Sequence, residues 1–165
     1  MTQTHLLFLL MALLIGVVAG LRSLTAPAVV SWGAYLGSIT LQSTWAAWVA
    51  SLITAIVLTV LAVGELVNDK LPKTPPRTAP PVFAARIIMG GFAGAVIGAS
   101  HHWTVTCLGA GIIGAVLGTL GGYQARKRLV AAIGGKDLPI ALLEDAVAIG
   151  GGIAIVAATA ALLAQ

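Results

Sequence analysis

The sequence predicts an all-α integral membrane protein with six transmembrane helices, and two observations lead to this prediction. Hydrophobic residues make up 59% of the 165 residues and charged residues only 8%, whereas a soluble domain carries about 25% charged residues. The apolar residues also come in long runs, and a run of about 18 or more is typical of a membrane-spanning helix. No stretch between the runs is long enough to fold alone, so residues 1–165 are expected to form a single transmembrane domain.

Five apolar segments are expected to span the membrane. They are residues 6–21, 45–66, 82–100, 103–122 and 138–163. The first also resembles the core of a signal peptide, but residues 1–5 lack the Lys or Arg that normally precedes such a core. A sixth segment, residues 26–41, is short and contains several hydroxyl groups, so it either spans the membrane or re-enters it from one side.

The basic residues favour six spans over five spans and one re-entrant segment. With six spans and the N-terminus outside, Arg22 and the loops 67–81 and 123–137 all face the cytoplasm, and Arg86 lies one turn inside the span that follows. This distribution satisfies the positive-inside rule, and it accounts for the net charge of +4 without a nucleic-acid partner. The sequence therefore predicts a multi-pass protein of the bacterial inner membrane, in contact with membrane lipids.

The basic, proline-rich loop 67–81 divides the chain into two halves of three spans, residues 1–66 and 82–165. Halves with an odd number of spans have opposite orientations in the membrane, which is a common plan among transporters. The string GVVAG at 16–20 resembles GAVIG at 94–98, at the position that a 3+3 inverted repeat predicts. Helices rich in Gly, Ala and Val match one another easily, so a chance match is an equal alternative.

Glycines recur at every fourth position in two neighbouring spans. They are Gly90, Gly94 and Gly98 in the first, and Gly114, Gly118 and Gly122 in the second. Small residues at this spacing let helix backbones approach closely in lipid. We expect these two helices to cross in direct contact, or to form a homo-oligomer through the same faces.

Three of the predicted helix starts carry a capping side chain two residues before a proline. The pairs are Thr25 with Pro27, Thr78 with Pro80 and Asp137 with Pro139. A capping oxygen satisfies a free N–H group, and a proline in the first turn lacks the donor that would otherwise be unsatisfied. The simpler interpretation is three capped helices; the functional one is three positive helix ends that face the cytoplasm and suit anions.

Polar and ionisable side chains gather at the cytoplasmic end of the predicted bundle. The candidate substrate- or ion-binding residues are Arg22, Ser23, Thr25, Glu65, Asn68, Asp69, Lys70, Lys73, Arg77, Arg86, Glu144 and Asp145. An ionisable group inside the membrane costs several kcal/mol, so it tends to face the bundle interior with a partner. These residues are therefore expected to line a polar chamber.

We expect Arg86 to pair with Glu144 or Asp145, because all three lie inside apolar spans that begin at the cytoplasmic face. A purely structural network, in which Arg22 and Arg86 neutralise the intramembrane acids, is the alternative. Two arginines facing Glu65, Glu144 and Asp145 would leave one acid spare. A spare intramembrane carboxylate is a candidate site for a proton or a cation.

Sequence motifs for catalysis and for metal binding are missing from the chain. It has no HExxH, P-loop or GxSxG motif, which argues against an enzyme, and no catalytic residue or cofactor is expected. Cys107 is the only cysteine, which excludes an internal disulfide and a cysteine-built zinc site. His5, His101 and His102 fall on the outer face, where we expect solvated side chains rather than a metal site.

Three strings together resemble an uncharacterised bacterial family of multi-pass membrane proteins, a domain of unknown function. They are GLRSLTAPAV at 20–29, NDKLPKTPPR at 68–77 and LEDA at 143–146. The resemblance covers most of the chain. It implies a multi-pass membrane protein but no particular activity.

The leading functional hypothesis is a transporter or channel for a small anionic solute. Arg22, Lys70, Lys73 and Arg77 would attract the anion, and Glu144 or Asp145 would carry a coupling proton. One alternative is a membrane enzyme or binding protein that holds a lipid phosphate headgroup with the same basic residues. Another is a structural or assembly protein whose glycine faces bind a partner.

Overall fold

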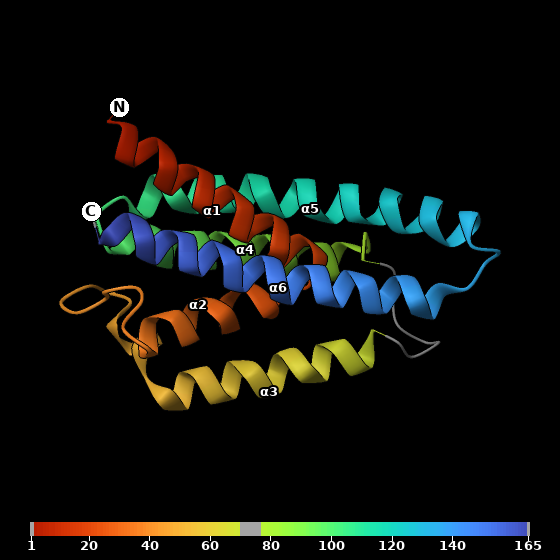
Figure 1. Cartoon of the computed structure of the whole chain (residues 1–165), viewed down its shortest axis with the longest axis horizontal. Coiled ribbons are helices and arrows are strands. Elements are labelled where there is room, and N and C mark those ends of the chain that lie inside the picture. The colour runs from red at the N-terminus through yellow and green to blue at the C-terminus, as the bar shows by residue number, and fades with distance from the viewer. Residues whose placement is uncertain (1, 70–76, 165) are drawn as a thin grey trace.

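The computed structural model describes residues 2–69 and 77–164, and within these ranges it is a bundle of helices without strands (Figure 1). The helices are α1 (Gln3–Leu21), α2 (Thr25–Tyr35), the short 3-10 helix η1 (Ala47–Ala50), α3 (Leu52–Asn68), α4 (Pro80–Ala99), α5 (Thr104–Ala132) and α6 (Asp137–Leu163). The predicted all-α fold is therefore confirmed.

Four of these helices, α1, α4, α5 and α6, are long and apolar enough to cross a membrane. The helix α3 is apolar but has 17 residues, and α2 has only 11. At about 1.5 Å per residue, α2 extends for roughly 17 Å, little more than half of a hydrocarbon core of about 30 Å. An all-helical membrane protein fits these helices, whereas six complete spans remain a prediction.

Close packing of α1, α4 and α5 forms the centre of the bundle. Gly94 and Gly98 of α4 lie against Cys107 of α5, and Gly111 of α5 lies against the carbonyl of Gly90. A side chain at any of these glycines would collide with the opposite helix, so the backbones can approach this closely only because the residues are glycine. The predicted contact between the fourth and fifth predicted spans is therefore confirmed.

Two other glycines of α5 face a different neighbour from the one expected. Gly114 lies against the carbonyl of Leu13 and Gly118 against that of Val17, both in α1. The four-residue spacing correctly predicted a close helix contact, but α5 has glycines on two faces and packs on α1 as well as on α4. The spacing alone could not tell which neighbour each face would meet.

The glycines that suggested an inverted repeat share a packing role. Gly16 and Gly20 of α1 and Gly94 of α4 lie against the backbone of α5, and Gly98 of α4 lies against the side chain of Cys107 in α5. Close approach to one helix is sufficient to explain the similar strings. The inverted repeat remains a prediction.

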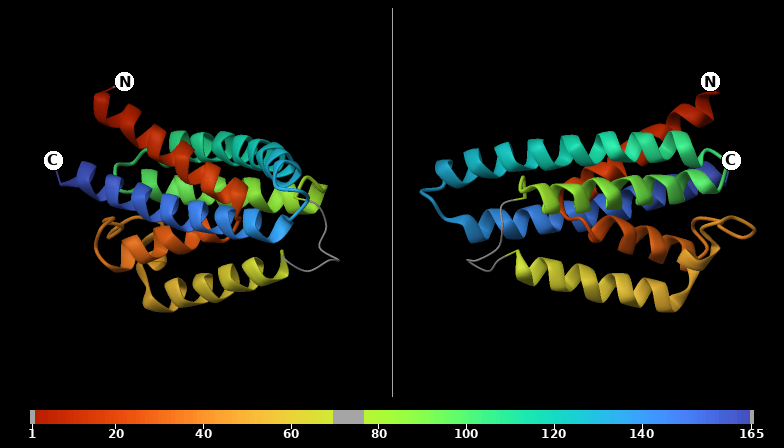
Figure 2. Two further views of the ribbon diagram at one scale, coloured as in Figure 1. Left: turned by 45° about the vertical axis from the view of Figure 1, so that its right-hand side comes forward. Right: turned by 180° about the vertical axis from the view of Figure 1, so that it is seen from behind.

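The helix α3 lies at the edge of the bundle, where it packs mainly against α2 and η1 (Figures 1 and 2). Much of its apolar surface is exposed, including Ile53, Val57 and Val60. In a membrane protein, such an exposed apolar face would contact lipid.

Several helix boundaries differ from those predicted. The helix α5 continues to Ala132, ten residues beyond the predicted end, because residues 123–132 lack Pro and Gly and contain good helix formers. The predicted span 45–66 begins instead with η1, and α3 starts after Ser51, whose hydroxyl caps Ile53 N–H. The predicted segment 26–41 is helical only as far as Tyr35.

The three predicted side-chain caps are wrong. Leu24, Ala79 and Lys136 occupy the cap positions of α2, α4 and α6, and none makes a side-chain cap hydrogen bond. Thr25 and Asp137 are the first helical residues instead. The helix α2 obtains its cap from a distant part of the chain.

Candidate functional site

A turn, residues 22–24, joins α1 to α2 and lies at the centre of the candidate site; Arg22 is buried, and Ser23 and Leu24 are partly buried. The chain reverses direction here, so the carbonyl end of α1 and the N–H end of α2 lie close together (Figure 1). Each helix end has about half a unit charge, negative at the carbonyl end and positive at the N–H end. Because Arg22 is 0% exposed and Ser23 and Leu24 are partly buried, water has little access to these charges, and other groups of the protein neutralise them.

The N-terminus of α2 is neutralised by the carboxylate of Glu65 from α3. Oε1 accepts hydrogen bonds from Ser23 N–H (2.8 Å) and from the Ser23 hydroxyl (2.7 Å), and Oε2 accepts one from Leu24 N–H (2.8 Å). Three donors thus converge on one carboxylate, as at helix N-termini that bind anions. We call this arrangement the Glu65 seat.

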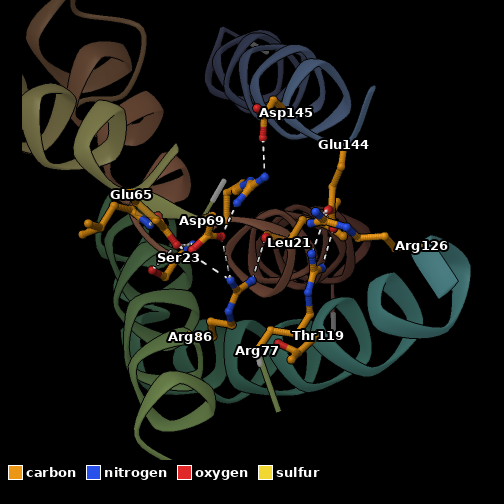
Figure 3. Close-up of polar contacts among 12 residues, drawn as sticks. Leu21, Ser23, Glu65, Asp69, Arg77, Arg86, Thr119, Arg126, Glu144 and Asp145 are labelled. Atoms are coloured by element: carbon orange, nitrogen blue, oxygen red, sulfur yellow. Dashed lines mark hydrogen bonds and ion pairs between the residues drawn. The ribbon is translucent and has the colours of Figure 1, made fainter. Parts of the chain in front are cut away.

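The C-terminus of α1 is neutralised by the guanidinium of Arg86 from α4. Nη1 of Arg86 donates to the carbonyls of Gly20 and Leu21, both at 2.6 Å, and Figure 3 shows the side chain reaching under the end of α1. The buried hydroxyl of Thr119 donates to the carbonyl of Gly20 as well (3.2 Å). Arg86 therefore acts as a cap supplied by another helix.

The predicted pairing of Arg86 with Glu144 or Asp145 is wrong. Nη2 of Arg86 lies 3.6 Å from Asp69 Oδ2 and 3.9 Å from Glu65 Oε1. The end of α1 draws the guanidinium towards the turn, where the acids within its reach, Glu65 and Asp69, belong to the C-terminal end of α3. The prediction that Arg86 faces the bundle interior beside acidic residues is confirmed, but it named the wrong acids.

Arg22 joins α3 to α6. One end of its guanidinium forms an ion pair with Asp69, and Nη2 lies 2.6 Å from Asp145 Oδ1. Arg22 and Arg86 both contact Asp69, so the two deeply buried arginines share one carboxylate. The Nε atoms of both arginines have no hydrogen-bond partner among the described residues.

Glu144 belongs to a second group of charges, on the right in Figure 3. Both Nη atoms of Arg77 donate to the carboxylate of Glu144, and the distance from Nη2 to Oε2 is 2.8 Å. Arg126 of α5 adds a contact of 3.2 Å and also holds Asp137 with hydrogen bonds of 2.9 and 2.6 Å. The sequence prediction missed Arg126 and Asp137, because it treated residues 123–137 as a loop.

Each of the five acids of the chain has an arginine within ion-pair distance. The predicted spare acid does not exist, because Arg77 and Arg126 join the two arginines that were considered. Of the other predicted site residues, Ser23 belongs to the Glu65 seat, Thr25 is buried in the first turn of α2, and Asn68 ends α3. Lys70 and Lys73 lie outside the described residues.

An apolar groove of about 520 Å³ lies beside this cluster, between α2, α3 and α6. Thr25 and Leu66 form part of its wall, and each adjoins a residue of the Glu65 seat in the chain. The groove continues along α2 past Trp32 to Leu36. None of the described residues that line it has a charged side chain.

Comparison with known protein families, with curated proteins and with solved structures finds no match to this chain. This result is consistent with the uncharacterised family that the three sequence strings resemble. Any function must therefore be inferred from the residues of the chain itself.

Proposed function

We propose that this protein transports a small oxyanion across a membrane, with the Glu65 seat as the binding site and Glu65 as the proton-carrying gate. The observation behind this proposal is the convergence of Ser23 N–H, the Ser23 hydroxyl and Leu24 N–H on one carboxylate. Broken or re-entrant helices commonly bind substrate anions in this way in transporters. Glu65 occupies the position that a substrate oxyanion would take.

Glu65 is the acid most suited to leave its place, because hydrogen bonds from the turn hold it more closely than an arginine does. Its arginine contact is 3.9 Å long, whereas Asp145 lies 2.6 Å from Arg22 and Glu144 is held by two arginines. The helix that carries Glu65 is also the peripheral α3. A movement of the Glu65 side chain would open the seat while the ion pairs of Asp69 with Arg22 and Arg86 keep α3 in place.

The proposed coupling uses one proton for each anion. Protonation of Glu65 removes its charge and weakens its hold on the N–H groups of the turn. The oxyanion then binds the same three donors and restores the negative charge beside Arg22 and Arg86. When the anion leaves, Glu65 loses its proton and returns, so one proton and one monovalent anion cross together and no net charge moves.

Exposed basic residues at the same end of the bundle would concentrate anions near the site. Lys127, Arg128 and Lys136 are exposed where α5 and α6 extend beyond the turn (Figure 1). Clustered positive charge raises the local concentration of anions and the rate of their association. This supports anions rather than cations as the substrate.

We also infer six passes, with α2 as a half-length pass. In Figure 1, α1 and α3 run in the same direction, so the chain must return between them through α2 and residues 36–51. Trp45 Nε1 donates to Thr104 Oγ1 (3.2 Å), and His5 Nε2 lies 3.1 Å from Thr106 Oγ1. The N-terminus, residues 36–51 and the start of α5 therefore share one end, opposite the arginines, and the positive-inside rule assigns that end to the outer face.

Flux into proteoliposomes tests the proposed function. Purified protein in vesicles should accelerate uptake of acetate or inorganic phosphate, and an inward proton gradient should increase it. A panel of anions and cations that moves no faster than in empty vesicles would refute transport.

Replacing Glu65 by Gln tests the role of the gate. The amide oxygen can still accept from Ser23 and Leu24, but the side chain cannot take up a proton. Uptake should lose its dependence on the proton gradient. The matched control is Asp137→Asn, which also neutralises one arginine-paired acid but should keep that dependence; loss in both variants would contradict a special role for Glu65.

Binding of a lipid phosphate headgroup is less favoured, because the described arginines that it would need already hold carboxylates. A purely structural role predicts that Glu65→Gln behaves like wild type in every assay except stability. Capping of α2 by Glu65 fits a structural role as well, so the loss of proton-dependent uptake in Glu65→Gln is the result that separates transport from it.

A further inference from the structure

We propose that the groove between α2, α3 and α6 holds one acyl chain of a membrane phospholipid, which packs α3 onto the rest of the bundle. This inference rests on the groove alone and does not depend on the transport proposal.

Three apolar helix faces meet across this groove without filling it. The face of α3 consists of Thr59, Ala62, Val63 and Leu66, and the face of α6 of Ile149, Ile153, Val156 and Ala157. Residues three and four positions apart lie on one face of a helix, so each helix presents a continuous apolar surface to the groove. The groove is open along one side, so it leaves apolar surface of all three helices free to contact a partner that is not part of the described chain.

The chemistry of the lining selects a hydrocarbon. The few polar groups in the wall include the Trp32 indole and the Thr59 hydroxyl, and these are bonded to each other across the groove (2.8 Å). The Thr59 hydroxyl also donates to the carbonyl of Ala55. A polar ligand would therefore find few free partners here, whereas a hydrocarbon chain needs none.

The length of the groove matches the chain of one membrane leaflet. It follows α2 from Thr25 to Leu36, a distance of roughly 17 Å at about 1.5 Å per residue. One leaflet contributes about half of a hydrocarbon core of about 30 Å thickness. A single acyl chain therefore extends along the groove from end to end.

The charges at one end of the groove orient the lipid. Thr25 and Leu66 border the end beside the Glu65 seat, and the exposed basic residues Lys127, Arg128 and Lys136 lie at the same end of the bundle. A phospholipid with an anionic headgroup towards this end would have its phosphate at the basic end of the bundle and its chain in the groove.

Fluorescence of Trp32 provides the test. In a variant whose other tryptophans, Trp45, Trp48 and Trp103, are replaced by Phe, the delipidated protein in detergent is titrated with phosphatidylglycerol that has brominated chains. We expect saturable quenching, and native mass spectrometry should show one bound lipid per chain.

Filling the groove separates this site from general contact with lipid. Ala157→Phe in α6, or Val63→Phe in α3 where the first variant fails to fold, should weaken the saturable quenching at least tenfold. Ala154→Phe is the matched control, because Ala154 is an exposed residue of α6 outside the groove lining.

Two results would overturn the proposal. One is equal quenching in the filled and control variants. The other is a dimer in native mass spectrometry that Ala157→Phe dissociates, because a second copy of the chain would then be what fills the groove.

Discussion

Replacing Arg86 by Leu should destabilise the protein strongly, because this side chain has two tasks. It donates to the buried carbonyls of Gly20 and Leu21 at the end of α1, and it lies beside the carboxylates of Glu65 and Asp69. Arg86 is only 2% exposed, so water cannot replace the lost donors. Leu fills part of the volume but satisfies none of these groups.

The expected loss is about 4 kcal/mol. A hydrogen bond to a charged group contributes about 1.5–3 kcal/mol, and two carbonyls would lose one each. Removing one partner of a buried ion pair costs about 3–5 kcal/mol. The two estimates describe the same side chain and do not add. For a chain of this length, about 2–4 °C per kcal/mol gives a fall of about 10 °C in the thermal midpoint in detergent.

Second substitutions show which acid is affected. Adding Glu65→Gln to Arg86→Leu should recover part of the loss, because it removes the repulsion between Glu65 and Asp69 that Arg86 had offset. Adding Glu144→Gln should recover nothing, since Arg77 and Arg126 hold that acid. Rescue by Glu144→Gln, or an Arg86→Leu protein as stable as wild type, would refute this account of the cluster.

Three further predictions concern packing, the outer ion pair and topology. Gly111→Leu should cost about 1–3 kcal/mol or more of stability, because Gly111 lies against the backbone of α4. Gly109→Leu is the control, because a side chain there meets open space. Equal melting temperatures of the two variants would contradict the packing. Arg126→Gln should cost at most about 1 kcal/mol of stability, because Asp137 is 60% exposed and Glu144 keeps its ion pair with Arg77. A loss of stability near that of Arg86→Leu would contradict this prediction. Cysteines at positions 44 and 100, in a protein without Cys107, should react with a reagent added from outside, and labelling of both from the cytoplasmic side would reverse the topology.

The sequence was informative about which residues form the cluster, and less so about their partners. An arginine or carboxylate inside an apolar span must face the bundle interior, which correctly predicted the gathering of Arg22, Glu65 and Asp145. The partner of each depends on how the helices rotate about their axes. Hydropathy does not encode that rotation, and so Arg86 was assigned to the wrong acids.

The cap of α2 could not be predicted from nearby residues. Thr25 stands where a local cap was expected, but it is the first helical residue. The donors of the turn are satisfied by Glu65, which lies more than forty positions later in the chain. Local propensity gives no information about such a distant acceptor.

The length of α5 was predictable in principle. Residues 123–132 contain Gln, Ala, Arg, Lys and Leu and no Gly or Pro, and these residues favour a helix. The basic charges were interpreted as a loop because they end the apolar run. A helix can leave the membrane without ending, and the missed pairing of Arg126 with Asp137 follows from that error.

Infrared difference spectroscopy on Glu65 tests the central claim most directly. Addition of acetate or phosphate to the protein at mildly acidic pH should produce the carbonyl band of a newly protonated carboxylic acid, because the anion displaces Glu65 from Ser23 and Leu24. The band should be absent in Glu65→Gln and present in Asp137→Asn. Anion binding that leaves Glu65 ionised, or a band that persists in Glu65→Gln, would contradict the proposal that this carboxylate occupies the place of the substrate.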